Sequence, residues 1–224
     1  MQLEGKIINF LGDSITEGTG VTDKENYRYV NIICRVYGLK AVNNYGIGGT
    51  RIAHQSVPSD KPRYDLCFCG RAYNIDPRAD ITVVYGGVND YIHGDAPIGT
   101  PTDQTPETFW GGVNFLMAFL KERFIGKTVV FMTPARACPD GMSDMIKFNH
   151  PAKREDAMPL VGYVDIIKAA GKAHDIPVLD MYHSFPIDPN NEKDRKKYTV
   201  DGLHFNNEGH KIIAKHLASF LISL

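Results

Sequence analysis

The sequence predicts an α/β protein in which helices cover both faces of a five-stranded parallel sheet. Short runs of β-branched and other apolar residues alternate along the chain with longer segments whose apolar residues recur at helical spacing. Such alternation is typical of βαβ units, which place parallel strands in the middle and helices outside. The length of 224 residues suits one domain with a sizeable core. We therefore expect a single domain over residues 1–224, built as a three-layer α/β/α sandwich.

Five segments are expected to form the sheet. The apolar runs lie at residues 7–11, 41–45, 81–85, 128–132 and 177–179, and the second run is the weakest. Each is short and mostly apolar, as strands are when helices cover both of their faces. Short right-handed crossovers between consecutive strands favour the spatial order 2-1-3-4-5, which is the order of flavodoxin-like folds.

Four segments are expected to form the main helices. They cover residues 26–36, 106–124, 160–174 and about 207–222. The second is the clearest, because its apolar residues recur at helical spacing over its whole length. Thr105 is placed to cap this helix, Pro106 suits its first position, and Gly126 is expected to end it.

Polar or glycine-rich motifs follow the first three expected strands. They read Gly12-Asp13-Ser14-Ile15, Asn44-Tyr45-Gly46-Ile47-Gly48-Gly49-Thr50 and Gly86-Gly87-Val88-Asn89-Asp90. In open α/β sheets, ligands bind outside the carboxyl ends of the strands. All three motifs therefore lie where this architecture places its functional sites.

A fourth motif near the C-terminus, Asp201-Gly202-Leu203-His204, supplies a carboxylate and an imidazole three residues apart. A serine hydroxyl is a weak nucleophile near neutral pH and needs an adjacent base. Ser14, His204 and Asp201 have the residue types of a serine-hydrolase triad, which is defined by geometry and roles and occurs in several chain orders. Taken alone, Ser14 has the alternative of a turn or helix-cap residue, and Asp201-Gly202 has that of a turn.

In order and spacing, the four motifs resemble four sequence blocks of the GDSL or SGNH hydrolase family. The resemblance implies an SGNH hydrolase fold and a serine esterase or acylhydrolase that requires no metal and no organic cofactor. It also implies roles: Ser14 is the nucleophile, His204 is the base, and Asp201 orients the histidine ring. The pentapeptide Gly-x-Ser-x-Gly is absent, which disfavours an ordinary α/β-hydrolase.

The same resemblance implies three donors for the oxyanion that forms when an ester carbonyl is attacked. They are the backbone N–H groups of Ser14 and Gly49 and the side-chain amide of Asn89. Gly49 is chosen because the family glycine lies five residues after the asparagine that matches Asn44. Gly48 is the alternative, since either glycine offers an N–H without a side chain in the way.

Several other polar residues of these motifs and their surroundings are candidates for the site. Asp13 and Asn44 are expected to support the turn that carries Ser14. Candidates for touching the substrate, each with solvated surface as its alternative, are Thr16, Glu17, Arg51, His54, Tyr91 and His93. Two long connections, residues 90–105 and 134–159, are expected to line the substrate site, with plain surface excursions as the alternative.

The polar residues in the loops favour a small acyl group on a polar, carbohydrate-like substrate. No long apolar, lid-like helix is visible that would favour long acyl chains, so a lysophospholipase or thioesterase is the first alternative. A catalytically silent carbohydrate-binding protein on the same scaffold is the second, which the intact Ser14, Asp201 and His204 disfavour. A flavodoxin-like binder of a nucleotide or flavin is the third. Negative charge from Asp13 and Glu17 after the first strand would repel its phosphate.

Composition and charge disfavour several other classes. The formal net charge is −1, so no overall basic field would attract nucleic acid. The N-terminus lacks a basic segment followed by an apolar run, and no segment is long enough for membrane insertion. We therefore expect a cytoplasmic protein, or a secreted one if a signal peptide has been removed. Free thiols without metal-site spacing are expected at Cys34, Cys67, Cys69 and Cys138. The oligomeric state is not predicted.

Overall fold

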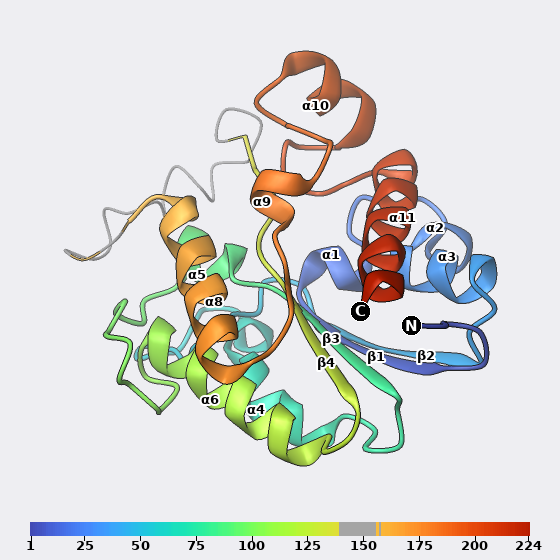
Figure 1. Ribbon diagram of the computed structural model, residues 1–224. Helices are drawn as coiled ribbons and strands as arrows, with labels where there is room; N and C mark the ends of the chain where they lie inside the picture. Colours follow the sequence, from blue (N-terminus) through green and yellow to red (C-terminus); the bar gives the residue numbers. More distant parts are fainter. Residues whose placement is uncertain (139–155, 157) are drawn as a thin grey trace.

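The computed structural model describes residues 1–138, 156 and 158–224. In this part of the chain, a five-stranded parallel sheet lies between two layers of helices (Figure 1). The strand order is β2-β1-β3-β4-β5, and every pairing between neighbouring strands is parallel. The predicted fold class and strand order are therefore confirmed.

The ends of three strands meet at one edge of the sheet. The strands are β1 (Ile7–Gly12), β2 (Ala41–Gly46), β3 (Ile81–Tyr85), β4 (Thr128–Met132) and β5 (Val178–Leu179). Each lies within one residue of its expected range. Gly12 at the end of β1 pairs with both Gly46 and Tyr85, which are the last residues of β2 and β3. The segments that follow these three strands therefore leave the sheet side by side, and they carry the three motifs.

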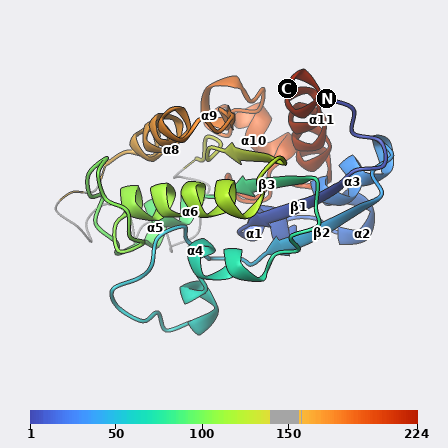
Figure 2. The ribbon, with the colours of Figure 1, turned by 60° about the horizontal axis from the view of Figure 1, so that its bottom comes forward.

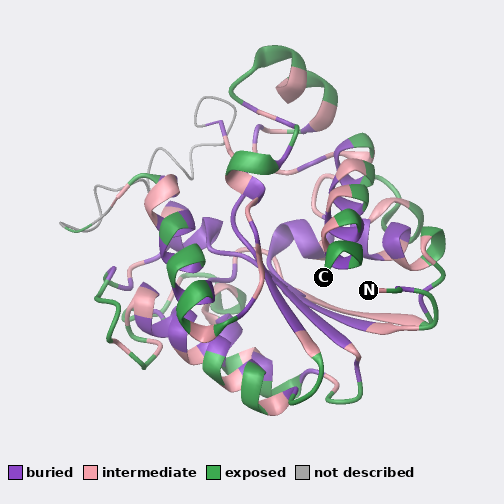
Figure 3. Ribbon diagram, in the orientation of Figure 1, coloured by how far each residue is buried: buried purple, intermediate pink, exposed green. Residues whose placement is uncertain are grey.

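Successive side chains of a strand point to opposite faces of the sheet, so the hydrophobic core is divided into two layers. The covering helices are α3 (Tyr29–Val36) and α11 (Asn207–Ser223) on one face, and α4 (Phe68–Arg71), α6 (Phe109–Arg123) and α8 (Leu160–His174) on the other. In β1, Ile8 and Phe10 pack in the first layer, whereas Leu11 packs in the second. Figure 2 shows α6 and α4 lying along the second face. In Figure 3 the central strands are buried, and β2 at the edge of the sheet is half-buried along its length.

Shorter helices in the described part of the chain carry the connections. They are α1 (Ser14–Glu17), α2 (Lys24–Tyr27), α5 (Val88–His93), α9 (Met181–Ser184) and α10 (Glu192–Tyr198), with the 3₁₀ turns η1 (Pro62–Asp65) and η2 (Ala72–Asn74). Of the helices described, none is long and apolar enough to cross a membrane.

The helix expected over residues 26–36 is divided in two, so that prediction was wrong. Arg28 is extended, with φ −60° and ψ 136°, and separates α2 from α3. The N–H of Tyr29 does not continue the first helix, because it donates to Nδ1 of His210 on α11 at 3.1 Å. A contact from the other end of the chain therefore replaces the helical hydrogen bond at this point.

The start of α6 also differs from the prediction. Thr108 caps the helix, and its Oγ1 accepts the N–H of Gly111 at 3.0 Å. Thr105 and Pro106 lie outside the helix, because the carbonyl of Pro106 accepts a backbone N–H from the loop after β2. At the other end, the helix stops before Gly126, which adopts a φ of 73° in the turn toward β4.

Candidate active site

Ser14 lies where β1 ends and α1 begins. Gly12 allows a tight turn there, because a Cβ at this position would lie 2.1 Å from the hydroxyl oxygen of Thr16. Asp13 caps the short helix, and its Oδ1 accepts the N–H of Ile15 at 3.0 Å. Ser14 is 7% exposed, and its side chain lies at the carboxyl edge of the sheet.

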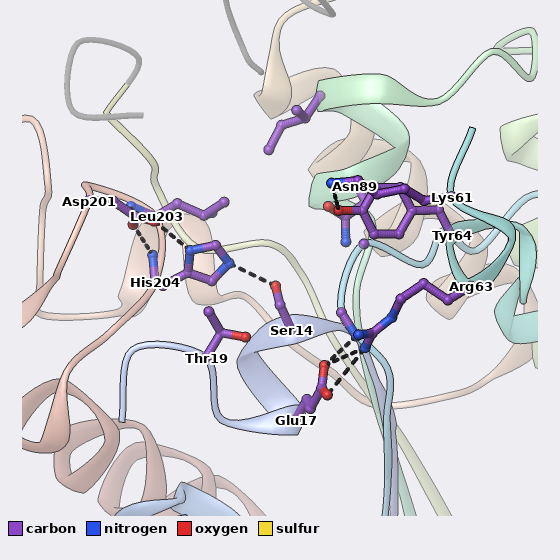
Figure 4. A pocket seen from close by; sticks show the side chains of 13 residues that line it. Ser14, Glu17, Thr19, Lys61, Arg63, Tyr64, Asn89, Asp201, Leu203 and His204 are labelled. Atoms are coloured by element: carbon purple, nitrogen blue, oxygen red, sulfur yellow. Dashed lines mark hydrogen bonds and ion pairs between the residues drawn. The ribbon is translucent and has the colours of Figure 1, made fainter. Parts of the chain in front are cut away.

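The C-terminal motif brings a histidine to this serine. Nε2 of His204 lies 2.9 Å from Oγ of Ser14, although 190 positions separate the two residues. On the other side of the ring, Nδ1 of His204 lies 2.6 Å from Oδ2 of Asp201. Figure 4 shows the three side chains following one another across the site. The structure thus brings together the three residues that the sequence suggests as a triad.

The loop that carries Asp201 holds its carboxylate in place. Oδ1 of Asp201 accepts the backbone N–H groups of Leu203 at 2.9 Å and of His204 at 2.7 Å. Gly202, which lies between Asp201 and Leu203, adopts a φ of 86°, a conformation that residues with a Cβ rarely take. The Asp-Gly pair therefore forms a turn, and the same turn leaves Oδ2 for the histidine ring.

The charge on Asp201 determines which nitrogen of His204 carries a proton. Burial alone would raise the pKa of Asp201, but hydrogen bonds from the His204 ring and from nearby backbone N–H groups outweigh it. Its pKa therefore lies below the usual 3.8. An ionised carboxylate can only accept, so Nδ1 of His204 donates, and Nε2 keeps a lone pair that can accept the Ser14 hydroxyl proton. This tautomer, assigned from its hydrogen-bond partners, is the one that a general base requires.

The glycine loop after β2 lies beside the serine. Gly49 has a φ of 80°, and a Cβ there would lie 2.2 Å from the ring of Tyr64, so both conformation and space require glycine. The N–H of Gly48 donates to Oε2 of Glu17 at 2.6 Å. The two neighbouring glycines therefore differ, because a carboxylate of α1 engages the N–H of Gly48.

Asn44 connects the glycine loop to the helix that begins at Ser14. Its Nδ2 donates to the carbonyl oxygen of Thr16 at 2.8 Å, and its Oδ1 accepts the N–H of Gly46 at 2.8 Å. One side chain therefore bridges the backbone of α1 and the end of β2. Asp13, through its helix cap, and Asn44, through this bridge, therefore both contact the backbone of the turn that carries Ser14.

Asn89 lies in the first turn of α5, directly after the third strand. Gly87 before it has a φ of 103° at the N-terminal end of this helix. The Asn89 side chain donates from Nδ2 to the carbonyl oxygen of Thr50 at 3.0 Å, and its Oδ1 lies 3.2 Å from Nε2 of His93. An amide nitrogen has two N–H groups, so one of them is still available to a ligand.

One cavity with a volume of about 430 Å³ is lined by Ser14, Gly49, Asn89, Asp201 and His204. Ser14, Asp201 and His204 lie along one side, and Asn89 lies on the other side of Ser14 in Figure 4. Gly49 also belongs to the lining. The volume is in the range of small-molecule sites. Candidate nucleophile, base and oxyanion donors therefore share one cavity.

The 3₁₀ turn η1 forms a wall of this cavity that is not predicted from the sequence. Lys61, Arg63 and Tyr64 line the cavity from this turn and from the residue before it. Arg63 forms an ion pair with Glu17 at 3.0 Å, which ties the turn to α1. The segment has no apolar periodicity, and its one local signal is Pro62, which suits the first position of a helical turn.

Three of the other polar candidates lie at or beside the cavity. Glu17 belongs to its lining. Arg51 and His93 are buried and contact each other beside a second cavity of about 500 Å³. Lys61 and Tyr64 line both cavities, so the second adjoins the first.

The structure does not bring the remaining three candidates to the lining of either cavity. Thr16 is fully buried, and its hydroxyl lies 2.9 Å from the hydroxyl of Tyr29. His54 is exposed on the loop after β2. Tyr91 packs edge-to-face against Tyr163 on α8, with ring centroids 5.8 Å apart.

The connection expected over residues 90–105 begins inside helix α5 and not as a loop. Ile92 lines the first cavity, and His93 and Asp95 line the second, so the first part of this connection does reach the cavities. The other long connection falls mostly on residues 139–155, which lie outside the described residues. Its expected role in lining the substrate stays a prediction.

The four cysteines are free thiols, as expected. Over residues 1–138, 156 and 158–224, no group of three or more His, Cys, Asp or Glu is placed to hold a metal ion. Charged groups of the cavity pair with one another: Asp201 with the His204 ring, and Glu17 with Arg63.

The buried Asp13 carboxyl group changes the stability of the folded protein with pH. It is 1% exposed, and this burial raises its pKa to about 6, although the Ile15 N–H and the nearby His204 and Arg71 act in the opposite direction. Between pH 3.8 and about 6, the folded protein therefore binds a proton that the unfolded chain has lost. By linkage, the contribution of Asp13 to stability is present below pH 3.8 and is lost as the pH rises through about 6.

Replacing Asp13 with asparagine should remove this pH-dependent loss, because the variant keeps an oxygen that can cap α1 but carries no charge. The free energy of unfolding of the variant, relative to the wild type, should rise between pH 4 and pH 7. The expected gain is on the order of 3 kcal/mol, which corresponds to the rise in pKa from 3.8 to about 6. Urea unfolding across this range measures it. Asp165→Asn, at an exposed position on α8, is the control. A difference that stays constant with pH would contradict the prediction.

The structure is a three-layer α/β/α sandwich with a serine, a histidine and a carboxylate in contact outside the carboxyl ends of its strands, the arrangement of a candidate serine hydrolase. The sequence model of the GDSL-like lipase/acylhydrolase family matches residues 10–212, and the chain belongs to this family. The protein is therefore an ester-hydrolysing enzyme, and the resemblance carried by the four motifs is confirmed.

Solved structures share the fold along almost the whole chain. A protein from Lactobacillus plantarum matches with a TM-score of 0.82 and 27% identity over 98% of both chains. An acetyl xylan esterase matches with a TM-score of 0.61 and 21% identity, over 95% of this chain and 98% of that one. A lipase/acylhydrolase from Enterococcus faecalis has a TM-score of 0.61 and 18% identity, over 96% and 95% of the two chains. No curated protein sequence matches the chain.

Proposed function

We propose that the protein is a serine esterase that removes a small acyl group from a polar, carbohydrate-like alcohol. The observation that carries this proposal is the continuous hydrogen-bonded series from Asp201 through His204 to Ser14 at the wall of a cavity. A serine hydroxyl becomes a useful nucleophile only when a base is in contact with it, and here the base lies 2.9 Å away.

In the first half of the reaction, Oγ of Ser14 attacks the acyl carbon of the ester. Its proton passes to Nε2 of His204, and the imidazolium that forms is stabilised by the ionised Asp201. His204 then gives this proton to the departing alcohol oxygen. The products of this half are the free alcohol and an acyl group bonded to Ser14.

The attacked carbonyl oxygen becomes negatively charged and needs donors that are already in place. We assign this role to the backbone N–H groups of Ser14 and Gly49 and to the free N–H of the Asn89 side chain. Gly49 is preferred to Gly48 because the N–H of Gly48 is engaged by Glu17 at 2.6 Å. Both glycines line the cavity.

In the second half, water replaces the alcohol. His204 takes a proton from the water, whose oxygen attacks the acyl carbon, and then returns a proton to Oγ of Ser14 as the acid leaves. All proton transfers use Nε2 of one histidine, and none needs a group that the chain lacks. Asp13 and Asn44 act only as braces of the serine turn and the glycine loop.

The lining of the cavity supports a polar substrate. Ile92 and Leu203 are outnumbered there by polar and charged side chains, among them Glu17, Lys61 and Arg63. Their carboxylate, ammonium and guanidinium groups can form hydrogen bonds with the hydroxyl groups of a sugar. One protein with this fold is an acetyl xylan esterase, and this likeness favours an acetylated carbohydrate as the proposed substrate.

A substrate panel tests the proposal. The panel contains acetylated xylose and xylo-oligosaccharides, p-nitrophenyl esters from acetate to dodecanoate, a lysophospholipid and an acyl thioester. We expect the highest kcat/KM for acetyl groups, with a steady fall as the acyl chain lengthens. A rise with chain length would favour the lysophospholipase or thioesterase alternative. Sugar binding without any turnover would favour the silent carbohydrate-binding alternative.

Replacing Asn89 with alanine should lower kcat by about 10²–10³-fold with little change in KM, because one oxyanion donor is lost in the transition state. Steady-state kinetics with p-nitrophenyl acetate measures this. Asn114→Ala is a matched control. Asn114 is a buried asparagine on α6 that does not line the cavity, and its amide donates to two backbone carbonyls. The control should lower stability and leave kcat within about twofold. A rise in KM alone for Asn89→Ala would make Asn89 a substrate-binding residue instead.

A further inference from the structure

A buried series of hydrogen bonds ends at the Asn89 amide. Nη1 of Arg51 lies 2.8 Å from Nδ1 of His93, and Nε2 of His93 lies 3.2 Å from Oδ1 of Asn89. Nδ2 of Asn89 then donates to the carbonyl oxygen of Thr50 at 3.0 Å. The three side chains are 3%, 7% and 5% exposed, so water competes little for these contacts.

The guanidinium of Arg51 fixes the direction of the series. A guanidinium can only donate, so Nδ1 of His93 must accept and carries no proton. The proton of the neutral imidazole is therefore on Nε2, which donates to Oδ1 of Asn89. Each side chain thus sets the role of the next one, and the last contact determines which atom of the amide faces His93.

Arg51 is itself anchored, because it joins the turn η1 to helix α5. Its Nη2 donates to Oδ1 of Asp65 at 2.9 Å and to the carbonyl oxygen of Tyr64 at 3.1 Å. Its Nη1 also donates to the carbonyl oxygen of His93 at 3.2 Å. The head group cannot turn away from His93 without breaking an ion pair and two bonds to backbone oxygens.

An asparagine amide has two orientations of nearly the same shape, in which nitrogen and oxygen exchange places. In the observed orientation, Nδ2 of Asn89 faces the carbonyl of Thr50 and has a second N–H available. In the reversed one, two donors would meet at His93, two acceptors would meet at Thr50, and lone pairs would replace N–H groups near the oxyanion. The wrong orientation is therefore opposed at both ends of the amide.

We propose that Arg51 and His93 are positioning residues of the esterase, which keep the nitrogen of the Asn89 amide available to the oxyanion. The inference rests on the oxyanion role proposed for Asn89 above. Neither residue is among the groups that line the first cavity, and both act through the amide. The alternative is that His93 only fills space, since its ring packs against Tyr64 with centroids 5.4 Å apart.

Histidine-ring ¹⁵N NMR of the unmodified protein tests the hydrogen-bond directions without any change to the fold. The His93 signals are assigned by their loss in His93→Gln. At pH 7 we expect a neutral ring with a proton on Nε2 and none on Nδ1. A ring with its proton on Nδ1, or one with both nitrogens protonated, would overturn the proposal.

Kinetics of two variants separate positioning from packing. His93→Gln places an amide N–H where Nε2 donates, so its kcat should stay within about threefold of the wild type. His93→Asn keeps an oxygen that can accept from Arg51 but is too short to reach Asn89. Its kcat should fall about tenfold at unchanged KM, which is less than the 10²–10³-fold expected for loss of an oxyanion donor. Equal losses in both variants would overturn the proposal.

A double-mutant cycle with Asn89→Ala completes the test. If His93 acts through the amide, His93→Asn should change kcat by less than twofold once Asn89 is alanine. The same tenfold loss in both backgrounds would show a structural role for His93 and would overturn the positioning proposal alone. If Asn89→Ala by itself leaves kcat unchanged, the oxyanion role of Asn89 fails instead, and the two failures are therefore distinct.

Discussion

Ser14→Ala is expected to lower kcat for p-nitrophenyl acetate by about 10⁶-fold, because removal of a serine nucleophile leaves only the oxyanion donors and substrate binding. The fold should survive. The helix cap is formed by Asp13 and not by Ser14, and the Ser14 hydroxyl contacts His204. Substrate affinity should change little, since the rest of the cavity is untouched. Steady-state kinetics and the melting temperature of the same preparation measure both expectations.

A second serine serves as the control for this variant. Ser223 lies at the exposed end of α11, and among the described residues its hydroxyl forms one hydrogen bond, to the backbone carbonyl of Phe220. Ser223→Ala should retain wild-type kcat. If a folded Ser14→Ala enzyme kept its activity within tenfold of the wild type, another residue would have to be the nucleophile.

Asp201→Asn is expected to lower kcat by about 10⁴-fold, the loss found when the orienting carboxylate of a serine triad becomes an amide. The loop geometry explains why. Oδ1 at this position accepts two backbone N–H groups, so an asparagine would keep its oxygen there and turn its nitrogen toward His204. Nδ1 of the ring would then have to accept, the proton would move to Nε2, and Ser14 would lose its base.

A distant aspartate offers a control for this second variant. Asp175 is fully exposed at the end of α8, with a φ of 53° that asparagine tolerates. Asp175→Asn should be indistinguishable from the wild type in kcat and KM. Full activity in Asp201→Asn at pH 7 would mean that the carboxylate does not set the tautomer of His204, and the assignment of the triad would then be wrong.

The sheet could be predicted from the sequence because its central strands are buried on both faces. Burial on both faces makes runs such as 81–85 mostly apolar, and the helices between them keep their own period. The break between α2 and α3 could not be predicted in this way. It depends on a hydrogen bond from Tyr29 to His210, which is 181 positions away and leaves no mark on the local pattern.

The candidate triad could be predicted because its residues lie in short motifs with fixed spacing. Asp201 and His204 share one turn, and Ser14 follows a strand directly, so local sequence carries most of their geometry. The wall made by η1 could not be predicted. The position of Tyr64 depends on the ion pair that its neighbour Arg63 forms with Glu17. It also depends on the missing side chain at Gly49, against which the Tyr64 ring packs, and both are tertiary contacts.

Arg51 and His93 fall between these two cases. Both are candidates from the sequence because they are polar and close to the motifs, but their expected contact was with substrate. The structure places them behind Asn89, where they contact each other and the amide. A lone arginine or histidine has no spacing rule that reports such a contact, so only the folded chain reveals it.

Covalent labelling tests the central claim, that Ser14 is a nucleophile activated by His204, most directly. Diisopropyl fluorophosphate reacts when a serine oxygen bonds to phosphorus, the P–F bond breaks, and fluoride and a proton leave. Tandem mass spectrometry should find one adduct, on Ser14, with loss of esterase activity in proportion to labelling. The adduct should be absent from Ser14→Ala and form far more slowly in His204→Ala. An adduct on a different residue that accounts for the lost activity, or an enzyme that stays active and unlabelled, would contradict this account.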